Sequence, residues 1–158
     1  MKNGLIGFIL GALVFGIVMY KAAPGMMMVE NKSKYGFDET VAKIEAACAA
    51  DGWKIPKIHR LDKSVSKIDS TVLPVAVIEL CKPIHAVQVL LNDEDKIVSS
   101  MMPCRVAIYE KKNGDVIISR MNTGLVAGLF GDVVANTMDH ATTDTEAIFK
   151  SVIAEKFV

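Results

Sequence analysis

The sequence predicts an N-terminal transmembrane helix in residues 1–25, followed by one α+β domain in residues 26–158 with a mainly antiparallel sheet. Residues 3–20 form an apolar run without a charged side chain, which indicates the membrane helix. In the rest of the chain, strand-like runs of β-branched residues are interspersed with helical patterns, as is typical of an α+β domain. Asn113 and Gly114 separate two such runs, and this pair is a strong signal for a hairpin of antiparallel strands.

Length and composition limit the classes of function. A chain of 158 residues has room for one compact domain and an appendage, but not for two full domains. The 18 Lys and Arg side chains balance the 18 Asp and Glu side chains, so no basic field attracts nucleic acid as a partner. Three cysteines are too few for a disulfide scaffold, and a hydrophobic share of 51% excludes a disordered chain.

The apolar run at residues 3–20 is expected to cross a lipid bilayer as a helix. Its 18 residues span about 27 Å, close to the roughly 30 Å thickness of the hydrocarbon core. A cleaved secretory signal is the alternative. The nearest candidate for its cleavage site, at residues 20–23, contains Lys21 and is followed by Pro24, so it does not match the usual pattern of small residues. Gly7 and Gly11 have the spacing that lets membrane helices associate, so we expect a homo-oligomer; the alternative is that these glycines mark no interface, since glycine is common in membrane helices.

Cap and turn residues mark the first half of the domain. Residues 26–30 form a first strand or an interfacial apolar patch. A helix follows, with Asp38 as its N-cap and Gly52 as its C-terminal stop. Residues 53–61 are extended, and a proline within them favours the edge of the sheet. Residues 62–70 are polar and form a short helix.

The centre of the domain is predicted to contain three strands and a helix. Residues 75–80 are apolar and β-branched, which indicates a largely buried strand. Pro83 suits a first helical position and starts a helix that runs to residue 91. Residues 105–110 and 115–121 are the two strands of the hairpin.

Two helices are expected to close the chain. Asn122 caps the first, which runs to about residue 138, and Thr143 with Glu146 forms a capping box for the second. The first helix contains three glycines, Gly124, Gly128 and Gly131. Together they cost about 2–3 kcal/mol relative to alanine, which is tolerated where another backbone or a flat ligand approaches closely. Packing of this helix between the sheet and a subunit partner is the alternative.

Residues 37–152 resemble an uncharacterised family known as domain of unknown function number 302. The match is carried by residues 81–86, by residues 102–110 with their Met-Pro-Cys-Arg start, by residues 119–122, and by the glycine-bearing helix. The resemblance implies a curved antiparallel sheet with helices on one face, similar to the TATA-binding-protein-like group, often self-associating and without an agreed activity. It also implies an exported domain. We therefore expect a single-pass protein of a bacterial inner membrane with its C-terminal domain in the periplasm, although the flanking lysines alone favour the cytoplasm.

Candidate ligand-binding residues are mostly soft donors. They are Cys81, His85, Met101, Met102 and Cys104. Thiolate, thioether and imidazole groups suit haem iron or Cu(I), and they do not favour magnesium or calcium. The alternative is that the cysteines and methionines are ordinary core residues and that the histidine is hydrogen-bonded.

Two arginines extend this hypothesis. Arg105 and Arg120 lie near the ends of the hairpin strands, where either can bind an anion such as a haem propionate. The alternative is that they pair with nearby acidic residues, Glu110 and Asp115.

The resulting functional hypothesis is a membrane-anchored, homo-oligomeric cofactor-binding protein in electron transfer or sensing of small molecules or sulfur species, with haem as the first candidate. His85 or Met102 supplies an axial contact, and Gly124 and Gly128 line the porphyrin face. One alternative is sulfur chemistry or Cu(I) binding by Cys81 and Cys104. Another is a structural oligomer without a ligand.

Overall fold

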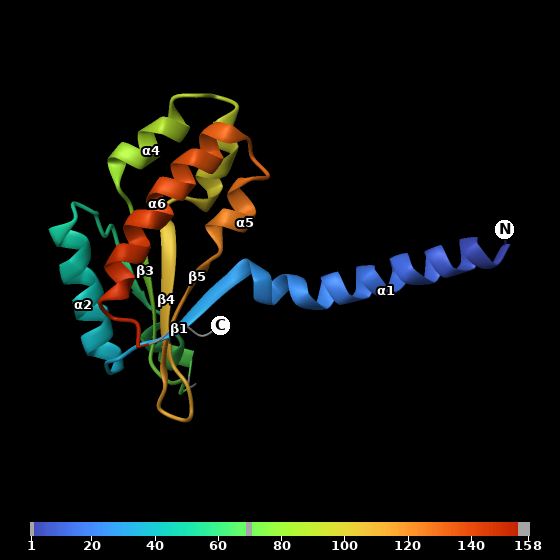
Figure 1. Cartoon of the computed structure of the whole chain (residues 1–158). Coiled ribbons are helices and arrows are strands. Elements are labelled where there is room, and N and C mark those ends of the chain that lie inside the picture. The colour runs from blue at the N-terminus through green and yellow to red at the C-terminus, as the bar shows by residue number, and fades with distance from the viewer. Residues whose placement is uncertain (1, 69–70, 155–158) are drawn as a thin grey trace.

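The computed structural model describes residues 2–68 and 71–154 and has a mixed α+β fold, as predicted. An N-terminal helix, α1 (Lys2–Met27), projects from a domain in which helices pack against a five-stranded sheet (Figure 1). The strands are β1 (Met28–Lys32), β2 (Ile58–Arg60), β3 (Val75–Leu80), β4 (Cys104–Glu110) and β5 (Val116–Met121). The other helices are α2 (Phe37–Ala50), α3 (Leu61–Val65), α4 (Pro83–Leu90), α5 (Thr123–Ala127), α6 (Asp132–Lys150), and the 3-10 helices η1 (Ser66–Ile68) and η2 (Asp95–Met101).

The strands follow the order β1-β5-β4-β3-β2, and every neighbouring pair is antiparallel. β4 and β5 form the predicted hairpin, in which the Gly114 amide donates to the Lys111 carbonyl at 2.9 Å. Gly114 has a φ of +82°, which glycine adopts without strain. β2 lies at a sheet edge, as expected for residues 53–61. The helix expected at residues 62–70 corresponds to α3 and η1; residues 69–70 and 155–158 of the predicted domain lie outside the described residues.

The main core lies between one face of the sheet and the helices α2 and α6. Ile78, Ile108 and Ile118, one from each of the three central strands, are fully buried there. Phe149 of α6 and Cys48 of α2 belong to the same cluster and are also fully buried. Because side chains alternate along a strand, the residues directly before and after each of these isoleucines face the other side of the sheet.

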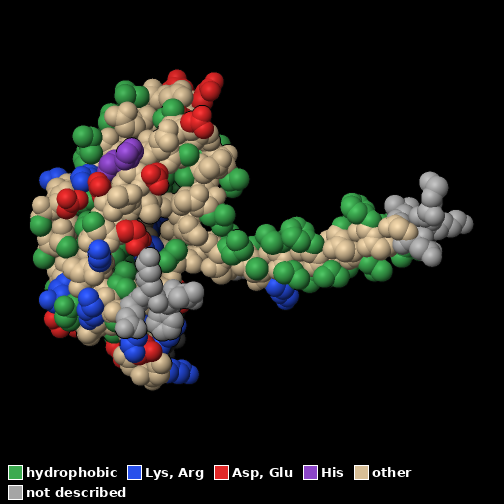
Figure 2. All heavy atoms as spheres, viewed as in Figure 1, with side chains coloured by type: hydrophobic (Ala, Val, Ile, Leu, Met, Phe, Trp, Pro, Cys, Tyr) green, Lys and Arg blue, Asp and Glu red, His purple; other side chains and the backbone are tan. Residues whose placement is uncertain are grey.

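The N-terminal helix is apolar and exposed along its length. Its segment Ile6–Ala23 is long and apolar enough to cross a membrane, and none of it is buried in the domain. Figure 2 shows the apolar side chains that cover this helix on its visible face. A signal sequence has the same length and composition, so the helix by itself establishes the capacity to span a bilayer and no more.

The junction between α1 and the domain differs from the prediction. Residues 26 and 27 are still helical, and β1 begins at Met28 without a loop, so a strand starting at residue 26 was wrong by two residues. The Asn122 amide donates to the Met27 carbonyl at 2.8 Å, and the Asn122 side chain donates to the Met26 carbonyl at 2.9 Å. These contacts satisfy carbonyls that a helix end otherwise leaves without partners.

The ends of α2 were predicted partly correctly. Gly36 is the N-cap, and Asp38 lies inside the first turn, where its charge favours the positive end of the helix dipole. The assignment of Asp38 as N-cap was therefore wrong. Gly52 follows the helix with a φ of +74°, which confirms it as the stop.

The C-terminal helices are divided differently from the prediction. The helix expected from residue 122 to 138 breaks after Ala127, and Gly131, with a φ of +92°, precedes a new helix. That helix, α6, continues through Thr143, so a capping box at Thr143 was wrong. The hydroxyls of Thr142 and Thr145 donate to carbonyls one turn earlier, which lets threonines lie within the helix.

Candidate functional site

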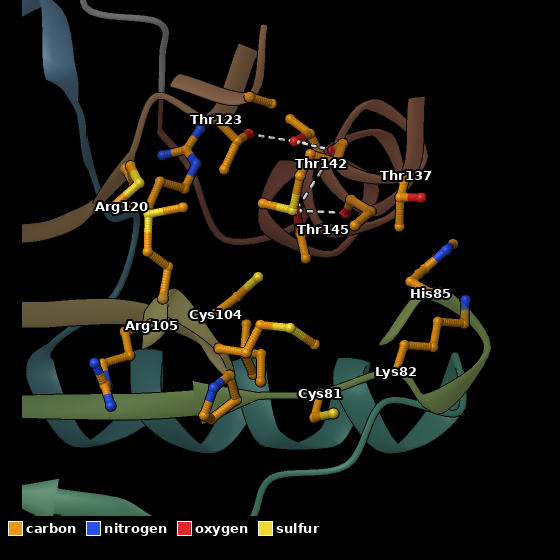
Figure 3. Close-up of a pocket in the computed structure, with 18 of the residues that line it drawn as sticks. Cys81, Lys82, His85, Cys104, Arg105, Arg120, Thr123, Thr137, Thr142 and Thr145 are labelled. Atoms are coloured by element: carbon orange, nitrogen blue, oxygen red, sulfur yellow. Dashed lines mark hydrogen bonds between the residues drawn. The ribbon is translucent and has the colours of Figure 1, made fainter. Parts of the chain in front are cut away.

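A cavity of about 360 Å³ lies between the sheet and the helices α4, α5 and α6. Leu80 and Val106 of the sheet line it, as do Val89 of α4, Val126 of α5 and Val134 of α6. Figure 3 shows Arg120 near one end and Lys82 with His85 near the other, with Cys81 and Cys104 between them. The cavity is therefore a largely apolar space with charged groups at both ends.

The soft donors predicted from the sequence all line this cavity. They are Cys81, His85, Met101, Met102 and Cys104. The pairing of Leu80 with Cys104 across β3 and β4 brings Cys81, the next residue, close to Cys104. Burial, and to a smaller extent the Cys81 thiol, raises the pKa of Cys104. Because a higher pKa reduces the thiolate fraction, Cys104 is poorly suited as a nucleophile.

Metal coordination finds limited support in the donor geometry. Within the described residues, no group of three or more His, Cys, Asp or Glu side chains is arranged to hold a metal ion. The cavity does contain thiols, thioethers and an imidazole, which are donors for soft metals. All three cysteines are free thiols, so Cys81 and Cys104 do not form a disulfide here.

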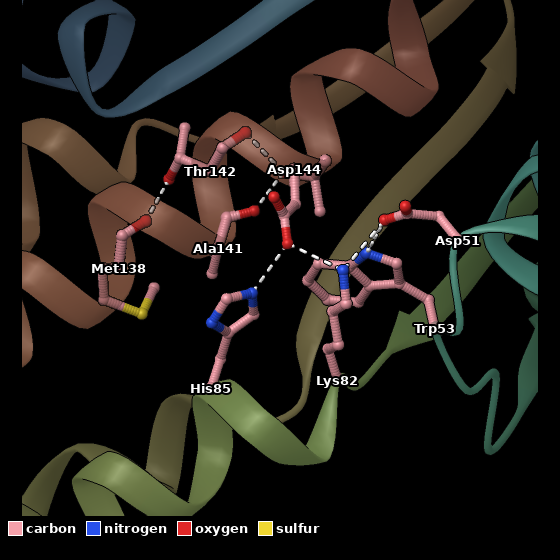
Figure 4. Close-up of polar contacts among 9 residues, drawn as sticks. Asp51, Trp53, Lys82, His85, Met138, Ala141, Thr142 and Asp144 are labelled. Carbon is pink, nitrogen blue, oxygen red and sulfur yellow. Dashed lines mark hydrogen bonds and ion pairs between the residues drawn. The ribbon is translucent and has the colours of Figure 1, made fainter.

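His85 belongs to a polar cluster that connects α4 with α6. Its Nε2 atom lies 2.8 Å from Oδ2 of Asp144, and Lys82 Nζ lies 2.8 Å from the same oxygen (Figure 4). Lys82 also donates to Asp51 at 3.0 Å, and the Trp53 indole donates to Asp51 at 3.2 Å. The hydrogen bond from Lys82, and then that from His85, lowers the pKa of Asp144. The two aspartates raise the pKa of Lys82 in return, with Asp144 as the larger cause.

Arg120 is the buried charge at the other end of the cavity. Its Nε donates to Oε1 of Glu146 at 2.6 Å, and its Nη1 donates to Oδ1 of Asn31 at 2.8 Å. The guanidinium also lies over the ring of Phe149, at 5.2 Å from the ring centroid. The alternative that this arginine pairs with Glu110 or Asp115 was wrong, because the side chain turns to the helix-covered face of the sheet and pairs with Glu146.

Arg105 faces the opposite side of the sheet from Arg120. Val106 is the register partner of Arg120, so Arg105, one residue earlier, points away from the helices. Its side chain is 55% exposed, and its Nε lies 3.8 Å from Oε1 of Glu79 rather than beside Glu110 or Asp115. Arg105 also lies among the residues that border the cavity, but its guanidinium is on the opposite face of the sheet from that of Arg120.

The glycines proposed to contact a ligand lie on the outer surface. Gly124 and Gly128 are exposed, whereas Thr123, Val126 and Ala127 of the same helical turn region line the cavity. A Cβ atom added at Gly128 would meet no described atom within 4 Å, and one at Gly124 would meet only the Asn122 side chain at 3.8 Å. Within the described chain, therefore, no neighbouring group comes close enough to require glycine at these two positions.

Three residues of the site were missed by sequence reasoning. They are Lys82, Asp144 and Glu146, which make ion pairs around the cavity. In the sequence, Lys82 was only part of the family match and Glu146 only part of an expected capping box. The sequence signal that could have placed α6 at the cavity was the periodicity of its small and polar residues. Thr137, Ala141 and Thr145 recur at every fourth residue and line the cavity together.

Comparison with known proteins matches residues 29–155 to the family described as Domain of unknown function DUF302. One similar solved structure is the crystal structure of an uncharacterized conserved protein DUF302 from Bacillus stearothermophilus, with a TM-score of 0.71 and 19% sequence identity. The similarity covers 79% of this chain and 97% of that chain. At this identity it establishes the shared fold alone. No curated protein matches the chain.

Proposed function

This chain belongs to the DUF302 family, and from this premise we propose that its domain binds a small, largely apolar molecule in the cavity beneath α4, α5 and α6. The observation that carries the proposal is the cavity itself. Its volume of about 360 Å³ falls within the range of small-molecule sites, and its apolar lining with a few charged groups is typical of them. The proposed role is binding or sensing, and the raised pKa of Cys104 disfavours that thiol as a nucleophile.

Haem, the first cofactor expected from the sequence, is one candidate for this molecule. In its favour, Met102 and His85 line the same cavity, so either side chain is near the space that a flat cofactor would occupy. Against it, His85 Nε2 is held by Asp144, and Arg105 points to the other face of the sheet. The side chains that line the cavity therefore suit a largely apolar molecule better than they suit haem held in the way that the sequence predicted.

One preparation tests both statements. The full-length chain is purified from membranes, its visible spectrum is recorded, and bound molecules are extracted and identified by mass spectrometry. A Soret band supports haem, and its absence removes haem from the proposal.

Two variants test whether the molecule occupies the cavity. The variant Ala127→Leu fills the cavity, whereas Ala147→Leu places the same side chain on the exposed surface of α6. Wild type and Ala147→Leu are expected to carry the molecule and Ala127→Leu to lose it; equal amounts in all three contradict the proposal.

A second candidate is binding of Cu(I) by Cys81 and Cys104. The two thiols share a cavity with Met101 and Met102, and these are the sulfur ligands that Cu(I) prefers. Copper analysis of the same preparation tests it. A stoichiometric copper content that disappears in the variant with both cysteines replaced by serine supports this candidate, and an equal content in that variant excludes it.

We also propose that α1 remains attached as a single-pass anchor in a bacterial inner membrane, with the domain in the periplasm. The exposed apolar segment Ile6–Ala23 supports the anchor. After carbonate extraction, the full-length chain is expected in the membrane pellet. Protease added to spheroplasts is expected to digest the domain. A shortened chain in the supernatant contradicts the anchor, and a protected domain contradicts the periplasmic location.

A homo-oligomer is proposed from the same helix. Gly7 and Gly11 are exposed to the surroundings of α1 with no described atom near a Cβ placed on them, so a second helix has room to approach. Cross-linking in native membranes is expected to give a multimer that Gly11→Leu reduces and that Gly16→Leu, on the opposite side of the helix, leaves unchanged. A multimer that is equally abundant in both variants contradicts this interface.

A further inference from the structure

Arg120 is a charged side chain that the fold holds inside the cavity. Only 10% of the side chain is exposed, and the residue lies among the apolar groups that line the space. A guanidinium has five N–H donors, and the contacts with Glu146 and Asn31 use three of them. A buried cation in an apolar site requires an anionic partner, because leaving it alone is strongly destabilising.

The two partners of Arg120 differ in how firmly they are held. Asn31 is 5% exposed and lies on β1, so its amide is a fixed, neutral contact. The Glu146 side chain is 45% exposed, and both of its contacts with the guanidinium use the single oxygen Oε1. Glu146 can therefore turn into water without burying its charge, whereas Asn31 stays in place.

An apolar wall begins directly beside this ion pair. Val106 faces Arg120 across the β4–β5 register, and Phe149 lies under the guanidinium. The charged groups at the other end of the cavity already pair with one another through Lys82 and Asp144. The space between the two ends is lined by sulfur and aliphatic side chains, which suit a hydrocarbon chain.

We infer that the molecule bound in this cavity is a single-chain amphiphile with a carboxylate head, and that the head replaces Glu146 on Arg120. This inference rests on the proposed function and names the class of ligand for that site. Two carboxylates beside one guanidinium leave a net negative charge and repel each other, so the half-exposed Glu146 turns to solvent and the head keeps Arg120 paired. A neutral ligand would leave the Arg120–Glu146 pair intact.

The cavity also reaches the start of the domain. Met28, the first residue after α1, and Met121 both line it. The amphiphile can therefore come from the bilayer that holds the anchor or from the surrounding water. A ligand from either source has the same chemistry, a carboxylate head on a hydrocarbon chain.

The test uses the full-length chain in phosphatidylcholine nanodiscs, with dodecanoic acid and dodecan-1-ol as probes, each labelled with 13C at carbon 1. The two probes share a chain and differ in the charge of the head. In 13C NMR spectra, a protein-bound resonance is separated from the resonance of probe dissolved in the lipid, which empty nanodiscs define. The variants are Glu146→Gln, Arg120→Met and, as a matched control on the exposed surface of α2, Glu45→Gln.

The wild-type chain is expected to give a bound resonance with dodecanoic acid. Glu146→Gln is expected to raise the occupancy at subsaturating acid by about threefold or more, because the acid no longer competes with an internal carboxylate. Arg120→Met is expected to lower it by about tenfold or more, as for loss of a charge-assisted contact. Neither variant is expected to change the occupancy by dodecan-1-ol, and Glu45→Gln is expected to match the wild type with both probes.

Two results overturn the inference, and only the second also contradicts the proposed function. If acid and alcohol respond equally to Glu146→Gln, the cavity binds small molecules but does not select a carboxylate. If neither probe gives a bound resonance with the wild-type chain, the proposed function fails together with the inference. Because Arg120→Met can impair folding, Glu146→Gln decides the question alone. Filling rates with acid supplied in the nanodisc lipid or on albumin distinguish a bilayer source from an aqueous one.

Discussion

His85 Nε2 lies 2.8 Å from Oδ2 of Asp144, and this contact joins α4 to α6 beside the cavity. Lys82 donates to the same carboxylate oxygen from the residue that precedes α4. Asp144 therefore holds the start of α4 against α6 through two partners. Because both helices line the cavity, the contact also determines how far they can separate.

The carboxylate of Asp144 is expected to make stability depend on pH. Its pKa is lowered by the hydrogen bonds from Lys82 and His85, so its contribution is present above the usual aspartate range, near pH 4, and is lost as the pH falls through the lower folded-state pKa. Asp144→Asn is expected to reduce the free energy of unfolding by about 1 kcal/mol or less at pH 7, since the side chain is partly solvated. The difference from wild type is expected to shrink below about pH 4.

Thermal unfolding of the full-length chain, followed by circular dichroism between pH 2 and pH 8, measures this dependence. Asp139→Asn, at an exposed position of the same helix, is the control and is expected to behave as wild type. A difference between Asp144→Asn and wild type that stays constant across this range would refute the assignment.

The glycines between α5 and α6 are expected to respond differently to substitution. Gly131 has a φ of +92°, where a Cβ atom is strained, so Gly131→Ala is expected to destabilise the domain by about 1–2 kcal/mol. Gly128 has a φ of −61° and open space around it, so Gly128→Ala is expected to be neutral or stabilising by up to about 1 kcal/mol. Unfolding midpoints of the two variants check this. Equal losses would indicate that Gly128 is packed against something outside the described chain.

Cys48 is expected to be the least reactive of the three cysteines. Burial, with smaller contributions from Asp51 and Glu45, raises the pKa of Cys48 from 9.0 to about 11. At pH 8 this lowers the thiolate fraction about 100-fold, and the side chain is also fully buried. Iodoacetamide labelling of the native chain, read by mass spectrometry, is expected to modify Cys48 only after denaturation. Rapid native labelling of Cys48 would contradict its place in the core.

The hydroxyls of Ser33 and Thr40 form a buried hydrogen bond of 2.6 Å that ties the end of β1 to α2. Thr40→Val keeps the volume but removes the hydroxyl, which also donates to the Gly36 carbonyl at 2.8 Å. The expected loss of unfolding free energy is about 1–3 kcal/mol, because buried polar partners are left unsatisfied. Thr143→Val, on the exposed surface of α6, is the matched control. A loss no larger than that of the control would show that the bond contributes nothing.

The elements with strong local patterns were predicted best. β3, β4 and the hairpin turn at Gly114 were found almost where the sequence placed them, because alternation and turn chemistry are encoded over a few residues. The boundary between α5 and α6 was wrong. Threonines and glycines in that stretch are compatible with either a break or a continuous helix, and local propensity alone does not choose.

The site was also predictable only in part. Cys81, His85, Met102 and Cys104 were expected to lie together, and they line one cavity. The orientation of Arg120 was not predictable from β5, whose residues from Val116 to Arg120 are all buried and so show no alternation. Its partner Glu146 lies 26 residues away in the chain, on a different element.

The sequence by itself determined the apolar N-terminal helix, the α+β class, the antiparallel hairpin and two short-range pairs of soft side chains, Cys81 with His85 and Met102 with Cys104. Each of these depends on residues close together in the chain, whose spacing expresses a helical or strand period. The tertiary structure decided which arginine faces the cavity, which acids pair with Arg120 and His85, and that a cavity exists between the sheet and the helices. These features depend on strand register and on the packing of distant elements, and no local pattern specifies them.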